Sequence, residues 1–338
     1  MRFIRPTRPL LINEKSIFGF YVLKQTLIDF YDMYNSPPDG IHSFNSSFND
    51  TTGQKAVSTL TIPLVSADKK LMGIIQIIKD KDGNIIPFSP DDEALLSHFA
   101  NSASMFLQRA YTTRSLILRM IKMAELRDPK ETGAHVNRVA GYTMEIYDRW
   151  AYHHEIQFEE KEKFRDILKI SSMLHDVGKV AISDTILKKP SRFTPEEYRV
   201  MQNHTVYGAS LFNDLYSPAD ILSRDIALTH HENWDGTGYP GWVDPATGKI
   251  EKSDSNGKPL GKKGEEIPLG GRIVAIADVF DALCSKRVYK EPLGEDEVLD
   301  EMKKLSGAKF DPELVEIFFE VLPSIKHIQK HGDEASLY

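Results

Sequence analysis

An apolar helical run ends on side chains of the types that can bind metal in the stretch Ile167-Leu-Lys-Ile-Ser-Ser-Met-Leu-His-Asp-Val-Gly-Lys179, and this stretch indicates the fold and the site. His175 offers a neutral ring nitrogen, and Asp176 offers a carboxylate that can bridge two ions. Lys179 follows three residues later, on the same side of a helical turn, where it could meet a phosphate. Taken alone the dipeptide is weak evidence, since a core histidine beside a capping acid has the same sequence.

Further residues of the ligand type occur on both sides of this stretch. They are Glu131 and His135, which are four apart, then His204, the pair His230 and His231, and Asp278. With the dipeptide they make five histidines and three acids, more than one ion needs. The set predicts two or three metals with bridging carboxylates, and its chemistry suits iron, manganese and zinc alike.

Asp278 is the most informative single position in this set. It lies in the run Arg272-Ile-Val-Ala-Ile-Ala-Asp-Val-Phe-Asp281, where a carboxylate is costly to bury unless it is paired or bound to metal. A metal ligand is therefore the favoured interpretation. A buried salt bridge or a hydrogen bond between helices is the alternative.

From Ser115 onward the apolar residues recur at helical spacing, which predicts an all-helical domain. One long polar stretch, Trp242 to Glu266, interrupts it and is dense in glycine, lysine, aspartate and serine, so it is predicted to be a loop. The expected helices are residues 136–150, 161–174, 195–215, 221–231, 270–283, 295–305 and 311–322.

The first hundred residues have strand character instead. Residues 57–65 and 71–78 are rich in branched apolar side chains and flank a polar turn, so they predict an antiparallel hairpin. Ser89 and Pro90 then supply an N-cap and a first helical residue, followed by acids that suit the first turn. The sequence thus changes from strands to helix at this point.

The helix that begins at Pro90 is expected to be long. No proline interrupts it up to Arg127, and its apolar residues recur mostly at spacings of three and four. Such a seam is typical of a contact between two helices and predicts a homodimer through this helix. The alternative is a helix packed on its own domain and broken near Tyr111.

Composition narrows the classes of protein. A chain of 338 residues favours two domains. The net charge of −7 argues against a binder of nucleic-acid polymers, which normally present a basic field. Cys284 is the single cysteine, and the sequence has neither an apolar run of membrane-spanning length nor a signal peptide. These features predict a cytoplasmic protein with no membrane segment in this chain.

Two motifs carry a resemblance to a known family. His175-Asp-Val-Gly-Lys179 matches the signature of the HD phosphohydrolases, and His230-His-Glu-Asn-Trp-Asp-Gly-Thr-Gly-Tyr-Pro240 resembles that of the HD-GYP branch. The resemblance implies an all-α domain at residues 115–338 that hydrolyses cyclic di-GMP to linear pGpG, which is the end product in some members and is cleaved onward to GMP in others. Hydroxide activated at a bi- or trinuclear centre would attack the phosphorus. The implied metal ligands are Glu131, His135, His175, Asp176, His204, His230, His231 and Asp278.

The same resemblance implies roles for other residues. Asp176 and Lys179 would be catalytic. Lys179, Tyr239, Arg287 and Lys290 would contact the substrate. The presence of Glu131 together with His135 resembles the trinuclear members, which bind iron or manganese. The stretch 242–266 departs from the family pattern as an insertion, and it would form a lid, alter substrate choice or project into solvent.

The N-terminal part resembles a GAF domain in Lys15–Phe20 and Ser58–Leu64. The resulting fold class is an α+β GAF-like domain, residues 1–90, joined by a linker helix, residues 91–114, to the all-α HD-GYP domain. The GAF-like part would bind an unknown ligand. Competing functions are a catalytically silent cyclic di-GMP receptor, a hydrolase of a related cyclic dinucleotide, and an interaction module built on the long helix.

Overall fold

The computed structural model describes most of the chain, and the chain divides into two compact units, residues 1–116 and 117–338. The described stretches are residues 28–30, 58–79, 87–127, 133–214, 216–284 and 294–331. Several features of the sequence lie outside them, namely Lys15–Phe20, Glu131, Arg287 and Lys290.

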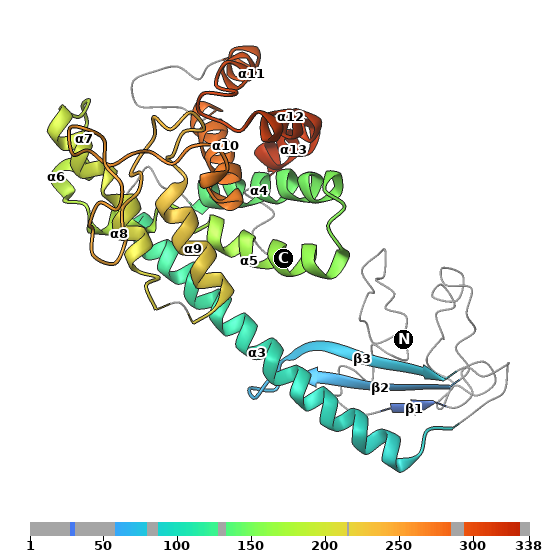
Figure 1. Ribbon diagram of the computed structural model, residues 1–338. Helices are drawn as coiled ribbons and strands as arrows, with labels where there is room; N and C mark the ends of the chain where they lie inside the picture. Colours follow the sequence, from blue (N-terminus) through green and yellow to red (C-terminus); the bar gives the residue numbers. More distant parts are fainter. Residues whose placement is uncertain are drawn as a thin grey trace. The chain divides into compact units, whose positions relative to one another are not determined.

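The described strands of the first unit form one antiparallel sheet in the order β1-β2-β3 (Figure 1). The predicted hairpin is confirmed, because β2 and β3 pair along their whole length on either side of the turn that starts at Ser66. Leu60 on β2 is fully buried and packs with Phe88 and Leu96, which places the start of the following helix against the sheet. The strands are β1 (Ile28–Phe30), β2 (Ser58–Val65) and β3 (Leu71–Lys79).

The long helix α3 (Pro90–Arg127) is continuous over 38 residues, as the sequence predicts, without a break at Tyr111 (Figure 1). Its start is capped as expected. The amide of Asp92 donates to Ser89 Oγ at 3.2 Å, and the amide of Ser89 donates back to Asp92 Oδ2 at 2.8 Å. This reciprocal pair satisfies two backbone groups that a helix start otherwise leaves without partners.

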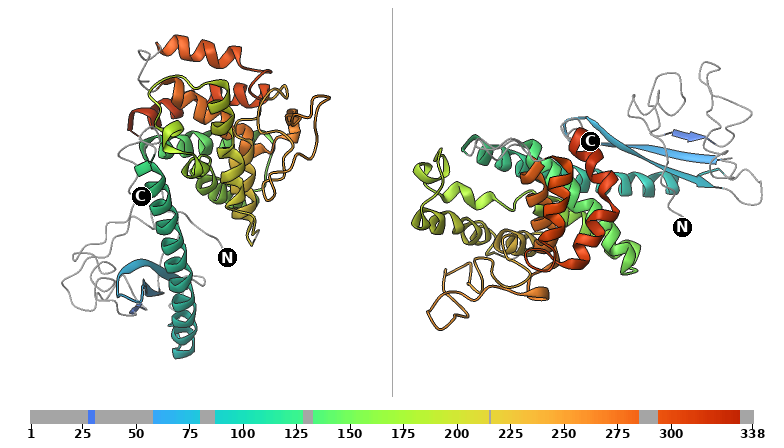
Figure 2. Two further views of the ribbon diagram at one scale, coloured as in Figure 1. Left: turned by 90° about the vertical axis from the view of Figure 1, so that its left-hand side faces the viewer. Right: turned by 90° about the horizontal axis from the view of Figure 1, so that it is seen from above.

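The described part of the second unit is helical, which confirms the all-α prediction for this region, and α4 lies at its centre. This helix contacts α5, α10, α12 and α13 (Figure 2). The main core lies between them and includes the fully buried Tyr142, Ile276 and Phe318. The helices are α4 (Gly133–His153), α5 (Phe158–Ser172), η1 (Val177–Ala181), α6 (Asp184–Leu187), α7 (Pro195–Gln202), α8 (His204–Ser210), α9 (Pro218–Thr229), η2 (Gly264–Glu266), α10 (Leu269–Cys284), α11 (Glu295–Lys304), α12 (Pro312–Glu320) and α13 (Leu322–His331).

The predicted single helix 195–215 is wrong, because α7 ends and α8 begins at Asn203. The Asn203 amide bonds back only three residues, to the Val200 carbonyl at 3.2 Å. The carbonyl of Gln202, which would continue the helical ladder, instead accepts the hydroxyl of Thr205 at 2.9 Å. This local tightening redirects the chain just before His204, a candidate ligand.

The polar stretch 242–266 is a loop, as predicted, and it projects from the helical body (Figure 2). Two isolated antiparallel bridges, Val243 with Ile250 and Ser253 with Pro259, give it internal order. At its base the Trp242 amide donates to the Leu260 carbonyl at 2.8 Å, and the Trp242 ring lies under the ammonium groups of Lys252 and Lys262. The insertion is therefore held together by its own contacts.

Candidate metal centre

Seven of the eight predicted metal ligands lie in the described part of the chain, and the fold brings them into two adjoining groups. Within each group the potential ligand atoms lie within 4.8 Å of one another. His175 Nε2 lies 3.4 Å from Asp176 Oδ2, which joins the two groups through neighbouring residues. The first group is Asp176, His204, His230 and His231, and the second is His135, His175 and Asp278.

Most of these side chains lie at helix ends, where the backbone can bring them together. His175 and Asp176 lie between α5 and η1, His204 begins α8, and His230 directly follows α9. Gly178 permits the close approach of η1 to α8, since a Cβ there would lie only 1.9 Å from the His204 carbonyl oxygen. The glycine of the motif is thus explained by packing.

The three histidines nearest Asp176 share one tautomer. The Nδ1 atoms of His175, His204 and His230 each lie within hydrogen-bond distance of a backbone carbonyl, at 2.8 Å from Ser172 O, 2.7 Å from Met201 O and 3.0 Å from Ile226 O respectively. A carbonyl only accepts, so each Nδ1 carries the proton and each Nε2 presents a lone pair. This is the form in which histidine binds metal.

These lone pairs converge on the Asp176 carboxylate. Its Oδ1 lies 3.1 Å from His204 Nε2 and 3.6 Å from His230 Nε2, yet none of these three buried atoms has a hydrogen-bond partner among the described residues. Acceptors facing one another without protons between them are unfavourable unless a cation lies among them. The residues present therefore fit a bound metal ion.

Burial and neighbouring charge set the protonation of this group. Burial lowers the pKa of His230 and of His231, which favours the neutral form of both rings. Burial alone would raise the pKa of Asp176, but the Lys179 ammonium and His175 hold it well below its usual range. Lys179 Nζ lies 2.6 Å from Asp176 Oδ2, so this lysine forms an ion pair with the aspartate, while its contact with a phosphate stays a prediction.

In the second group a further aspartate, which the sequence analysis did not identify, supports His135. Asp281 Oδ2 lies 2.8 Å from His135 Nδ1, which leaves His135 Nε2 directed toward Asp278, 3.6 Å from its Oδ1. Asp281 also accepts two hydrogen bonds from Arg138, at 2.7 and 2.8 Å, and one from Tyr142. A carboxylate behind a histidine fixes the ring and raises its basicity as a ligand.

The two aspartates of α10 have different environments. Asp278 is 16% exposed and lines a cavity, whereas Asp281 is 2% exposed and lies in the ion pair with Arg138. A buried salt bridge was the alternative environment for Asp278, and the structure shows it at Asp281 instead. A spacing of three residues on one helix face was the available signal for the second aspartate.

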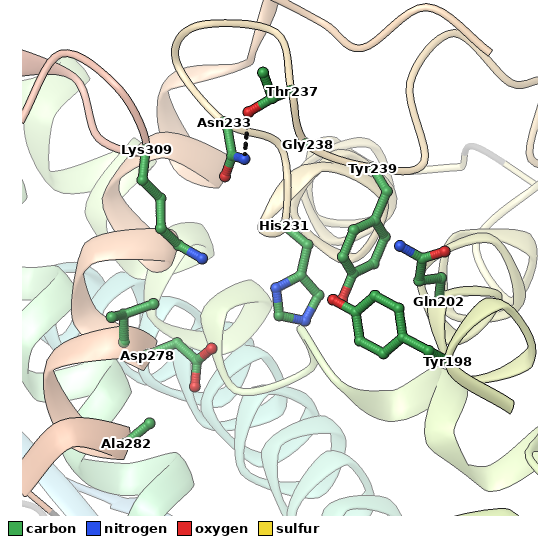
Figure 3. A pocket seen from close by; sticks show the side chains of 11 residues that line it. Tyr198, Gln202, His231, Asn233, Thr237, Gly238, Tyr239, Asp278, Ala282 and Lys309 are labelled. Carbon is green, nitrogen blue, oxygen red and sulfur yellow. Dashed lines mark hydrogen bonds between the residues drawn. The ribbon is translucent and has the colours of Figure 1, made fainter. Parts of the chain in front are cut away.

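A cavity of about 600 Å³ opens beside the ligand groups (Figure 3). His231 and Asp278 contribute to its wall from the two groups. Tyr239, a predicted substrate contact, also lines it, with its ring 4.9 Å from that of His231. The lining residues that the sequence analysis did not identify include Tyr198, Gln202, Asn233, Thr237 and Lys309, and none of those described comes from the insertion 242–266.

The segment that carries Tyr239 is fastened to the ligand group by Glu232. This buried side chain accepts from the amide of Gly241 at 2.6 Å and from the amide of Lys262 at 3.1 Å, which ties together both ends of the insertion. Burial raises the pKa of Glu232 to about 7. A Cβ on Gly238 would lie 2.2 Å from the Asn233 nitrogen, so the tight turn before Tyr239 needs glycine.

The part of the chain that carries this site is similar to known proteins. Residues 132–283 match the family model of the HD domain. The chain is 39% identical to the 3′3′-cGAMP-specific phosphodiesterase 2 of Vibrio cholerae serotype O1, with 62% of this chain and 35% of that protein covered. It is 36% identical to a cyclic di-GMP phosphodiesterase of Thermotoga maritima, with 63% and 51% covered. The chain thus spans about half or less of these relatives.

The HD domain of the phosphodiesterase PgpH from L. monocytogenes is a solved structure that was matched to this chain. It is 15% identical, with a TM-score of 0.37, and the match covers 62% of this chain and 97% of that one. Among the described helices of the present chain, none has the length and apolar character needed to cross a membrane.

Proposed function

We propose that this chain is a metal-dependent phosphodiesterase that hydrolyses cyclic di-GMP to linear pGpG and onward to GMP. The observation that carries the proposal is the pair of adjoining ligand groups beside a cavity of about 600 Å³. The names of the relatives support a cyclic dinucleotide as the substrate class. The HD match at residues 132–283 supports phosphodiester hydrolysis as the reaction.

In this proposal the two groups hold two divalent ions, iron or manganese, and Glu131 adds a ligand for a third. Bound ions of this kind act as Lewis acids and lower the pKa of a bound water. Asp176 would bridge the two groups, because its Oδ1 faces His204 while its Oδ2 lies 3.4 Å from His175 Nε2. Lys179 offsets the negative charge of this carboxylate and of a nearby phosphate.

Other residues of the chain would position the substrate. Tyr239 and His231 form one wall of the cavity, and the aromatic ring of Tyr239 offers a surface for a nucleotide. Arg287 and Lys290 would contact phosphate or guanine, as the resemblance to the family motif implies. Arg287 suits a two-pronged contact to either group.

A hydrolase of a related cyclic dinucleotide is the second candidate. The 39% identity to a 3′3′-cGAMP-specific phosphodiesterase favours it, since that substrate differs from cyclic di-GMP in one base. A silent cyclic di-GMP receptor is the third, and it would bind the ligand without turnover.

Turnover of cyclic di-GMP and of 3′3′-cGAMP by protein purified without oxygen and loaded with iron or manganese tests these candidates. Asp176→Ala serves as the inactive variant, and Asp300→Ala, on an exposed part of α11, serves as its matched control. Separation of the products by chromatography identifies pGpG and GMP. Faster turnover of 3′3′-cGAMP would replace the proposed substrate with the second candidate. Binding without turnover would replace the enzyme with the receptor.

We also propose that residues 1–90 form a GAF-like ligand-binding domain, that residues 91–114 form a linker and that the chain dimerises through α3. Large apolar side chains along α3, at spacings that are sums of three and four residues, support the dimer, with exposures of 51–71%. Sedimentation velocity of Phe106→Glu tests it, because a charge in the seam should yield monomers. A parent that sediments as a monomer would refute it. The seam residues are Leu95, Phe99, Phe106, Leu116, Met120 and Met123.

A further inference from the structure

Lys309 lies in the short turn between α11 and α12, and this turn is clamped to the segment that follows His231. The amide of Trp234 donates to the Lys309 carbonyl at 3.1 Å, and the amide of Asp235 donates to the Ala308 carbonyl at 2.9 Å. The turn is therefore fixed relative to the first ligand group, although some eighty residues separate the two in sequence. A side chain on it has a defined position beside the cavity.

The side chain of Lys309 points into the cavity, between Asp278 and His231 (Figure 3). It is the one lysine or arginine among the described residues that line this cavity. Burial lowers the pKa of Lys309, and the nearby Asp278 opposes this effect. A half-buried ammonium group beside two clusters of metal ligands is costly unless an anion occupies the space between them.

Asp278 acts on Lys309 from a distance, but no carboxylate of the described residues pairs directly with its ammonium group. Within the described residues the Lys309 ammonium has neither a hydrogen bond nor an ion pair within 4.0 Å. The nearby Asp278 places its Oδ1 3.6 Å from His135 Nε2, toward the second ligand group. Lys179 differs, since its ammonium lies 2.6 Å from Asp176. Lys309 is therefore the cation on this wall that is left available to a ligand.

We infer that Lys309 binds the scissile phosphodiester, through a charge-assisted hydrogen bond to a phosphate oxygen that faces away from the ligand groups. This inference rests on the proposed phosphodiesterase function and adds a substrate-binding residue that the sequence motifs do not contain. A phosphodiester carries the negative charge that the wall lacks, and a lysine ammonium binds it as a point charge. A contact to a guanine edge is the competing role.

The test compares Lys309→Met and Lys309→Arg with the parent on two substrates. Cyclic di-GMP carries both phosphodiester and guanine, whereas bis(p-nitrophenyl) phosphate carries only the phosphodiester. Lys309→Met should lower kcat/KM roughly 10- to 100-fold on both substrates, the range for a lost charged hydrogen bond. Lys309→Arg should retain most of the activity because it keeps the charge. Lys304→Met, which removes a 73% exposed lysine of the same region, is the matched control and should behave as the parent.

Each other outcome has a definite meaning. Unchanged turnover by Lys309→Met overturns the inference, and a loss confined to cyclic di-GMP assigns Lys309 to the base instead. A lower metal content in Lys309→Met, measured by elemental analysis, would show that the lysine supports the metal centre. If the parent is active only on bis(p-nitrophenyl) phosphate, cyclic di-GMP is refuted as the substrate, and the activity of the Lys309 variants on bis(p-nitrophenyl) phosphate still tests the phosphate contact. A parent inactive on both would refute the activity and this role together.

Discussion

Replacement of Asp281 with Asn should weaken both metal binding and folding stability, although Asp281 belongs to neither ligand group. Two oxygens of Asp281 serve four donor groups. Oδ1 accepts from Arg138 Nε at 2.7 Å and Tyr142 at 3.2 Å, while Oδ2 accepts from Arg138 Nη2 and lies against His135 Nδ1, both at 2.8 Å. An asparagine keeps the shape but turns one of these oxygens into a donor that faces two other donors.

Two magnitudes follow from this geometry. Breaking one side of a buried ion pair costs roughly 3–5 kcal/mol, and the retained oxygen of asparagine places the expected loss in the free energy of unfolding near the lower end, about 3 kcal/mol. Loss of the carboxylate behind a metal-binding histidine typically costs about 10- to 100-fold in metal affinity. Both losses should appear together in Asp281→Asn, because one carboxylate serves Arg138 and His135.

The assay is urea unfolding of the metal-free protein combined with manganese binding in competition with a chelating dye. Asp311→Asn is the matched control, because Asp311 is 4% exposed and pairs with Arg272 at 2.6 Å, but it belongs to neither ligand group. It should lose a similar amount of stability and keep the parent's metal affinity. If Asp281→Asn binds manganese as tightly as the parent, the assigned support of His135 is wrong, and a loss of stability below about 1 kcal/mol would refute the assigned ion pair with Arg138.

Three further substitutions test other parts of the site. Asp176→Ala should keep the parent's circular dichroism while losing bound metal and turnover, since the substitution removes the carboxylate proposed to bridge the two groups; a variant that retains metal would contradict the bridging role. Gly178→Ala should lower the free energy of unfolding in urea by about 2–4 kcal/mol, because its Cβ would lie 1.9 Å from the His204 carbonyl oxygen. An unchanged unfolding midpoint would show that η1 and α8 do not pack this closely. Glu232→Gln should remove a pH dependence. The raised pKa of Glu232, about 7, means that the metal-free parent loses up to about 3 kcal/mol of stability as the pH rises from 4.5 to 7, and parallel pH profiles for parent and variant would refute this.

The sequence was sufficient to predict those structural features that depend on residues close together along the chain. The hairpin, the cap at Ser89 and most helices follow from local spacing and propensity, and the described structure contains them. The break at Asn203 was not predictable, because apolar periodicity continues through it and a competing hydrogen bond from Thr205 decides it. Short-range hydrogen bonding can thus end a helix that its apolar pattern would extend.

The contributions of Asp281 and Lys309 could not be predicted for a different reason. Asp281 meets Arg138 across 143 residues of sequence, and Lys309 reaches the cavity only because its turn is bonded to Trp234. Asp281 has only its three-residue spacing from Asp278 as a local signal, which does not reveal its contact with Arg138, and Lys309 has no local pattern that distinguishes it from an ordinary surface charge. Such roles arise from the packing of distant segments, so a list of motif residues leaves out the groups that hold and complement them.

The central dipeptide shows how a short motif can specify two ligand groups at once. His175 belongs to one group and Asp176 to the other, because they lie in the irregular turn between α5 and η1, where consecutive side chains diverge. Their polar atoms nevertheless lie 3.4 Å apart. This dipeptide therefore supplies one side chain to each group at close range, while Gly178 brings α8 and its histidine close enough to complete the first group. Two ions held by these groups would each take a ligand from the same short turn, which would keep them near enough for one phosphodiester to contact both.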